Sequence, residues 1–255
     1  MSKIAASFSA EIIKSKNTFA LWLTFIGAAI IPLMVFITYA YNRDMFIPKT
    51  GENPWQEIFI RSFNGITLFT PLFIILIIGL LFNIEHRANA WKHIFVLPVS
   101  KSSVFLGKYL FVFFLVFIYY LLFVLLTLFN GCLLGAIKAQ LGFLNFSPDW
   151  NQIISFLTKF FIGTLAIIAI HFWLSFRIKN LIANLGIGLA GIAFAILLNG
   201  KGGLTIFLPY SFPIKMLNYV PNPTWFLEDY HIVSLFYFAL FFCLSYWDFT
   251  KRFKG

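Results

Sequence analysis

The segment at residues 85–108, EHRANAWKHIFVLPVSKSSVFLGK, is the part of the chain whose side chains are best suited to recognise another protein. It is charged, amphipathic and marked by a proline, and it lies between two long apolar runs. A helix over 88–97 would place Trp91, Ile94, Phe95 and Leu97 on a surface that could dock on a partner, with a polar side formed by Arg87, Lys92 and His93. The alternative is a loop that only anchors its neighbouring segments.

The flanks of this helix carry stop and start signals. Pro98 should end it, because proline cannot continue the backbone hydrogen bonds of a helix. Ser100 is expected to be the N-cap of a following helix, with Lys101 close to its start. Gly107 and Lys108 then mark the entry into the next apolar run.

Three polar residues lie inside apolar runs, namely Asn130, His171 and Asn184. A polar group in hydrocarbon needs a partner, so each is a candidate for the substrate path. Asn and His also join helices by hydrogen bonds, and this packing role is the one we favour. Acidic and basic residues are missing from the middle of the runs, which argues against a proton- or sodium-coupled carrier.

The sequence predicts neither catalytic residues nor a metal or cofactor site in this chain. Its two cysteines, Cys132 and Cys243, lie far apart and lack the companions that a metal site needs. Gly186, Gly188 and Gly191 spell GxGxxG, but neither a preceding strand nor a following acidic residue supports nucleotide binding. We interpret these glycines as contact points between helices.

Composition identifies the elements that must position these residues. Apolar residues make up 60% of the 255 positions, and 35 residues are Phe, which is more than one soluble core could bury. A bilayer requires about 20 apolar residues per helical span. The chain is therefore expected to be an all-α integral membrane protein with about six transmembrane helices, at residues 19–39, 66–84, 109–134, 156–176, 181–198 and 231–247.

The distribution of Lys and Arg predicts that both termini are cytoplasmic. This orientation places 12 of the 19 basic residues inside, and the other seven lie in outer loops that also hold most of the acidic residues. The net charge of +10 is then explained by topology and by contact with membrane lipids. The basic residues form no stripe, so we expect no binding to nucleic acid.

The chain is expected to form one transmembrane domain over 1–255, with three parts outside the spans. Residues 1–16 should form an interfacial helix, since Ile4, Phe8 and Ile12 share one face while Ser7 and Glu11 lie elsewhere. A frayed tail is the alternative. Residues 85–103 form the cytoplasmic connector, and residues 199–230 form an extracellular segment that contains Pro209, Pro213, Pro221 and Pro223.

The order of residues over 85–108 resembles a pattern found after the second span of type-2 ABC exporter permeases. The family pattern is E, then G-T-x-K or similar, then L-P-[VI]-[ST]-[KR], then G-K. This chain matches it with Glu85, Trp91-Lys92, Leu97-Pro98-Val99-Ser100-Lys101 and Gly107-Lys108, and has Asn89-Ala90-Trp91 where many members show Gly-Thr. The resemblance also covers the interfacial helix, the span number and the proline-marked outer segment.

The resemblance implies a membrane subunit of an exporter in the bacterial cytoplasmic (inner) membrane. ATP and Mg would be bound by a separate ABC ATPase subunit, in two copies, and a second permease copy, identical or homologous, would complete the complex. The ATPase would contact a coupling helix within the connector, and the residues assigned to this contact are Glu85, Arg87, Trp91, Lys92, Phe95, Leu97 and Pro98.

The cargo implied by the resemblance is hydrophobic or amphipathic. The chain is similar to the compact permeases of bacterial self-protection against lantibiotics and other peptide antibiotics, so a peptide antibiotic is favoured and a lipid is the alternative. Two other functions remain open: an integral membrane enzyme that modifies lipids, and a membrane assembly protein without catalytic activity.

Overall fold

The computed structural model describes residues 3–16, 18–41, 46–49, 51–96, 99–200, 203–217 and 226–253. Within these ranges all regular structure is helical, and six helices are long and apolar enough to cross a membrane. The expectation of an all-α membrane protein with six spans is thereby confirmed. The six helices are α2 (Phe19–Tyr41), α3 (Pro54–Arg87), α5 (Lys101–Ile137), α6 (Trp150–Arg177), α7 (Leu181–Leu198) and α9 (Asp229–Trp247).

Helix α3 begins 12 residues before the predicted span at 66–84. Asn53 caps its first turn by accepting a hydrogen bond from the Trp55 backbone N–H, and Pro54 occupies the first helical position, where a missing N–H costs little. The added turns are amphipathic, because Phe59 is buried while the Glu57–Arg61 ion pair is exposed. A search for continuous apolar runs therefore misses them.

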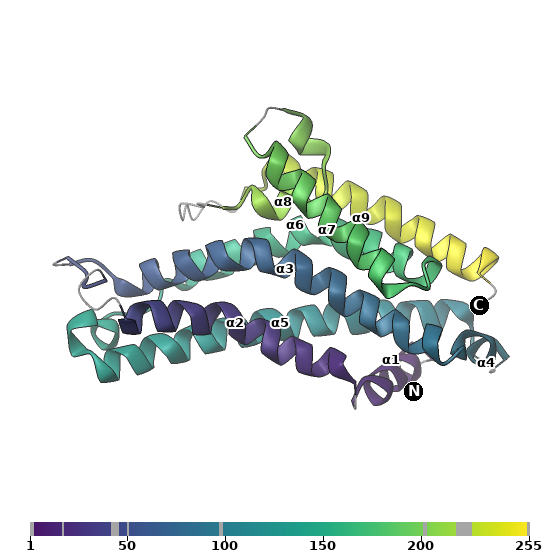
Figure 1. Ribbon diagram of the computed structural model, residues 1–255, viewed down its shortest axis with the longest axis horizontal. Coiled ribbons are helices and arrows are strands. Elements are labelled where there is room, and N and C mark those ends of the chain that lie inside the picture. Colours follow the sequence, from purple (N-terminus) through teal and green to yellow (C-terminus); the bar gives the residue numbers. More distant parts are fainter. Residues whose placement is uncertain are drawn as a thin grey trace.

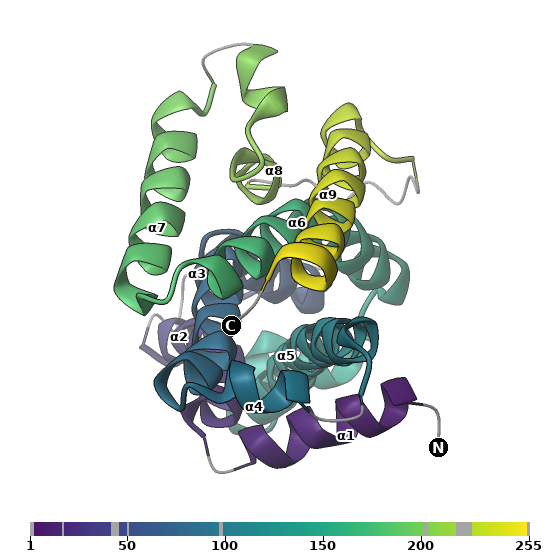
Figure 2. The same cartoon turned by 90° about the vertical axis from the view of Figure 1, so that its right-hand side faces the viewer.

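The helices form two groups on either side of α3 (Figures 1 and 2). The short helix α1 (Lys3–Ser15) packs on α5 together with α2, whereas α6 packs on α9 and α7 packs on α3. Helix α4 (Ala90–Val96), α1 and the last turn η4 (Asp248–Arg252) lie at the same end of the bundle. Two 3-10 turns, η1 (Ala139–Leu141) and η2 (Phe143–Asn145), lie at the opposite end.

Residues 203–217 form a return segment that packs back onto the bundle after α7. It contains the 3-10 helix η3 (Gly203–Phe207) and the short helix α8 (Ser211–Ile214). Helix α8 contacts α3, α6, α7 and α9, and the Phe212 side chain is fully buried among them. The predicted outer segment at 199–230 thus includes a part that enters the helix bundle, whereas Pro221 and Pro223 lie outside the described residues.

Candidate functional site

A sharp turn separates α3 from α4 and thereby creates the short helix. Helix α3 ends at Arg87, and Asn89 has φ of 46°, in the left-handed region. Asn tolerates this conformation better than other residues with a Cβ, because its side chain is short and polar. Asn89 therefore allows the chain to turn sharply between α3 and α4.

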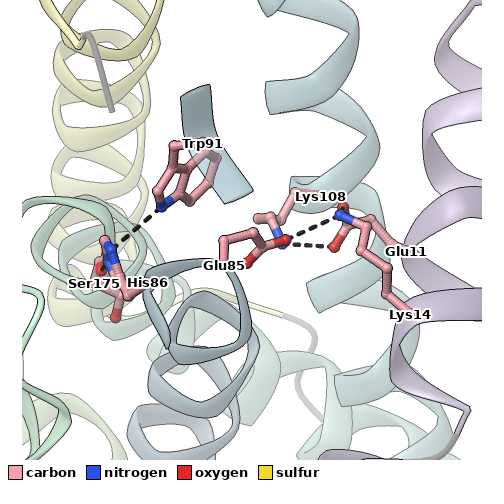
Figure 3. Close-up of polar contacts among 7 residues, drawn as sticks. All are labelled: Glu11, Lys14, Glu85, His86, Trp91, Lys108 and Ser175. Atoms are coloured by element: carbon pink, nitrogen blue, oxygen red, sulfur yellow. Dashed lines mark hydrogen bonds and ion pairs between the residues drawn. The ribbon is translucent and has the colours of Figure 1, made fainter. Parts of the chain in front are cut away.

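Trp91 anchors α4 to the rest of the helix bundle. Its side chain is buried against Phe82 of α3 and against Phe249 and Phe253 near the carboxyl end, at ring-centroid distances of 6.0, 5.7 and 5.3 Å. Its indole Nε1–H donates a hydrogen bond of 3.3 Å to His86 Nδ1 (Figure 3). Trp91 therefore supports α4 from behind and offers little surface to a partner.

Among the α4 side chains that the structure describes, Val96 lies away from Trp91 and is exposed. Val96 is 85% exposed, and Arg87 at the end of α3 and Val99 in the linker are exposed as well. The side chains of Lys92 and Phe95, and the whole of Leu97 and Pro98, lie outside what the structure describes. The predicted contact with a partner stays a prediction for all seven residues assigned to it: Glu85, Arg87, Trp91, Lys92, Phe95, Leu97 and Pro98.

Four ionised side chains from three helices form a charge cluster beside α4 (Figure 3). Lys108 Nζ of α5 lies 2.6 Å from Glu11 Oε2 of α1 and 2.8 Å from Glu85 Oε1 of α3. Lys14 Nζ lies 2.9 Å from the same Glu85 oxygen and also pairs with Glu11. The side chains of Lys108 and Glu85 are each 2% exposed, so this charge cluster is largely removed from water.

The charge cluster is balanced, with two carboxylates and two ammonium groups. Buried ions are tolerated only when they are paired and hydrogen-bonded, because a lone charge costs several kcal/mol to desolvate. Burial alone would raise the pKa of the Glu11 carboxyl, but the positive charges of Lys108 and Lys14 outweigh it and hold that pKa below its ordinary value. Removal of any one member would leave an uncompensated charge.

Gly107 allows α1 to approach α5 closely enough for these contacts. A Cβ at Gly107 would lie 2.6 Å from Ser7 Cβ and 3.0 Å from the Phe8 backbone N. The adjacent Lys108 then reaches the charge cluster from the same turn. Gly107 thus leaves room for α1, and the adjacent Lys108 joins α5 to α1 by an ion pair with Glu11.

The start of α5 agrees with the predicted capping. The Ser100 side chain accepts a hydrogen bond from the Ser103 backbone N–H, which confirms Ser100 as the N-cap. Lys101 Nζ donates a 2.7 Å hydrogen bond to the Phe253 carbonyl. This hydrogen bond joins the beginning of α5 to the carboxyl end of the chain.

Sequence reasoning missed Glu11, Lys14 and Lys108 as members of this site. A signal was present, because Glu11 is the only acidic residue before Asp44, and Lys108 is the only charged residue between Lys101 and Lys138. Isolated opposite charges at the ends of apolar runs favour a buried ion pair. In α1 the apolar side chain of Ile13 is 74% exposed. Glu11 is instead buried, with its carboxylate directed toward Lys108 of α5.

The three polar residues of the apolar runs separate into two places. Asn130 of α5 donates a 2.9 Å hydrogen bond from Nδ2 to the Pro32 carbonyl of α2, which is a contact between packed helices. His171 and Asn184 lie together, with His171 Nδ1 3.2 Å from Asn184 Oδ1, and both are buried. The structure gives each of the three a hydrogen-bond partner within the chain.

One protein-family model matches most of the chain. Residues 7–195, which include α4, the whole charge cluster, the first four spans and most of α7, match the family model described as ABC-2 family transporter protein. No curated protein and no solved structure matches the chain. Because the family model covers most of the chain, the protein belongs to the ABC-2 family of transporter proteins and is a permease subunit of an ABC transporter.

Proposed function

We propose that this chain is the membrane subunit of an ATP-driven exporter and that a separate ATPase docks on α4. The observation that carries the proposal is the way α4 is held: Trp91 fixes its inner side in an aromatic socket, while Val96 is left 85% exposed. A helix with one side packed on the bundle and an exposed residue on the other is suited to bind a partner and to transmit its movement.

The charge cluster would carry such movement into the bundle. Glu85 lies two residues before the end of α3, next to the turn into α4, and it is paired with Lys108 of α5. Displacement of α4 would therefore move α3 and α5 together, and α1 would follow through Glu11. Direct ionic contacts in a buried place resist separation better than exposed ones, since water does not screen them.

The remaining parts of the proposal follow from the family and the composition. Two ATPase copies would supply ATP and Mg binding, and a second permease copy would complete the translocation path. The aromatic-rich spans suit a hydrophobic or amphipathic cargo, with a peptide antibiotic favoured over a lipid. The bacterial cytoplasmic membrane is the proposed location, with α1 and α4 on the cytoplasmic side.

A lipid-modifying enzyme is the alternative, and its best candidate residues already have another role. The Glu228 side chain accepts the His231 backbone N–H, and His231 Nδ1 accepts the Glu228 backbone N–H at 3.1 Å. This reciprocal capping box begins α9 and accounts for the proximity of the two residues. The geometry therefore favours a structural use of this pair over catalysis.

The proposal is tested by copurification of an ATPase in mild detergent. Val96→Asp, and Phe95→Asp combined with Leu97→Asp, should abolish copurification and substrate-stimulated ATP hydrolysis while the chain still reaches the membrane, because charge enters a desolvated contact. Leu144→Asp is the matched control, since Leu144 is 65% exposed in η2 at the opposite end. An ATPase that stays bound and active with the α4 variants would refute the docking site.

A further inference from the structure

Two hydrogen-bond chains, the first part-buried and the second buried, meet at Ser175 of α6. The first begins at α4, where the Trp91 indole N–H donates to His86 Nδ1 at 3.3 Å. His86 Nε2 then lies 2.8 Å from the Ser175 backbone carbonyl (Figure 3). Ser175 is in the last turn of α6, whose carbonyls lack partners within the helix, so His86 satisfies an acceptor that would otherwise be open.

The second chain approaches Ser175 from the return segment. The Tyr210 hydroxyl lies 3.0 Å from His171 Nε2, and His171 Nδ1 lies 3.2 Å from Asn184 Oδ1. Asn184 Nδ2 donates to the Ser175 hydroxyl oxygen. The Ser175 hydroxyl is thus the last group of the second hydrogen-bond chain, and the Ser175 backbone carbonyl is the last group of the first.

With the Asn184 amide N–H as the donor to Ser175, every bond in the two hydrogen-bond chains has a consistent direction. A carbonyl only accepts, so His86 carries its proton on Nε2, and its Nδ1 is free to accept from Trp91. Asn184 uses its amide N–H toward Ser175, so its oxygen accepts from His171 Nδ1–H. His171 Nε2 then accepts from the Tyr210 hydroxyl.

Glycines on α7 make room for the second chain. A Cβ at Gly191 would lie 2.5 Å from the Tyr210 ring, and a Cβ at Gly188 would lie 3.0 Å from His171 Cε1 and 2.6 Å from Ile75. Gly186, the first glycine of the GxGxxG pattern, has no neighbouring atom within 4 Å of such a Cβ. Two of the three glycines therefore serve the buried polar contacts.

We infer that Ser175 joins α4 to the return segment and that His86 and His171 are positioning residues for transport. The role of this link in transport rests on the proposed function: a movement of α4 on ATPase binding would alter the return segment. The physical link is a property of this chain alone. Ser175, Asn184 and His171 are 2%, 1% and 0% exposed, so water does not compete for their bonds.

Coupling between two places is reciprocal, so each end must respond to a change at the other. Trp91→Phe removes the indole donor and keeps an aromatic ring, and Tyr210→Phe removes only the hydroxyl. Thr70→Val is the control, because it removes the buried hydrogen bond of 3.0 Å between Thr70 and Tyr119, which belongs to neither chain.

The test is amide hydrogen exchange of the full chain in lipid nanodiscs, read by mass spectrometry. Trp91→Phe should raise exchange in residues 203–217, and Tyr210→Phe should raise it in residues 86–96, each by about two- to tenfold, the factor that the loss of one hydrogen bond supplies. Thr70→Val should leave both segments unchanged. His171→Phe should reproduce the Tyr210→Phe result, whereas His171→Gln, which retains a donor and an acceptor, should restore protection.

The link is refuted if the effect of Trp91→Phe stays within residues 86–96 and that of Tyr210→Phe stays within residues 203–217. It is also refuted if Thr70→Val produces the same distant changes, because the response would then reflect general loosening. The measurement uses no ATPase. A failure of ATPase docking would therefore refute the proposed function while leaving the exchange result intact, and the reverse also holds.

Discussion

Lys108 Nζ and Glu11 Oε2 lie 2.6 Å apart although 97 positions separate the two residues in the chain. The contact joins the first helix to the beginning of the third span, and Glu85 at the end of the second span completes it. The interfacial helix predicted from the sequence is therefore an integral part of the end of the bundle that carries α4.

Lys108→Met should destabilise the protein by about 3–5 kcal/mol, the usual result when one partner of a buried ion pair is removed. The substitution leaves Glu11 and Glu85 with only Lys14 as a counterion. Glu57→Gln breaks the exposed pair with Arg61 and should cost less than about 1 kcal/mol. Unfolding in detergent micelles measures both, and equal stability of the two variants would contradict the buried cluster.

The stability of the protein should depend on acid pH through Glu11. Its pKa is lowered in the fold, because the charges of Lys108 and Lys14 outweigh the opposite effect of burial. The stabilising contribution is therefore full above the ordinary pKa of 4.5 and is lost as the pH falls through the lower pKa of the folded state.

Glu11→Gln removes this titration. The variant should be less stable than the wild type at neutral pH, and the difference should shrink as the pH falls below 4.5. Melting temperatures measured across this range in detergent provide the check. A difference that stays constant or grows toward acid pH would show that the Glu11 carboxylate is not held by the lysines.

The turn at Asn89 should accept glycine and reject valine. Asn89→Gly suits the φ of 46°, whereas Asn89→Val places a β-branched residue in the left-handed region at a cost of about 1–2 kcal/mol. Limited proteolysis near α4 should therefore accelerate for the valine variant and stay near the wild-type rate for the glycine variant. Equal rates for the two would mean that the turn is not needed to seat α4.

The orientation of the chain can be tested with an impermeant thiol reagent after Cys132 and Cys243 are replaced by serine. A cysteine at Leu144 should react in intact cells, and a cysteine at Val96 only after permeabilisation, because both positions are exposed but lie at opposite ends. The reverse pattern would invert the topology predicted from the basic residues.

Part of this architecture could be predicted from the sequence because it depends on local patterns. The span at 181–198 coincides with α7, since Asn180 caps its start and Gly200, with φ of 81°, follows its end. The Ser100 N-cap is equally local. The amphipathic beginning of α3 was missed because its exposed charges interrupt the apolar run.

The tertiary relationships could not be predicted in the same way. Amphipathicity shows that α4 has two faces but does not show which face is covered, so the inward position of Trp91 depends on Phe249 and Phe253, more than 150 residues away. The pairing of Lys108 and the meeting of two hydrogen-bond chains at Ser175 likewise require the packed bundle.

The most direct test of the central claim is photocrosslinking from Val96 in native membranes. A photoreactive amino acid at this position should form a covalent adduct with a protein that carries nucleotide-binding Walker motifs, and the same amino acid at Leu144 should not. The account predicts that the adduct is lost when Phe95 and Leu97 are replaced by Asp. Adducts with lipid alone, or with a protein that has no ATPase motifs, would contradict the assignment of α4 as the docking site of an ATPase.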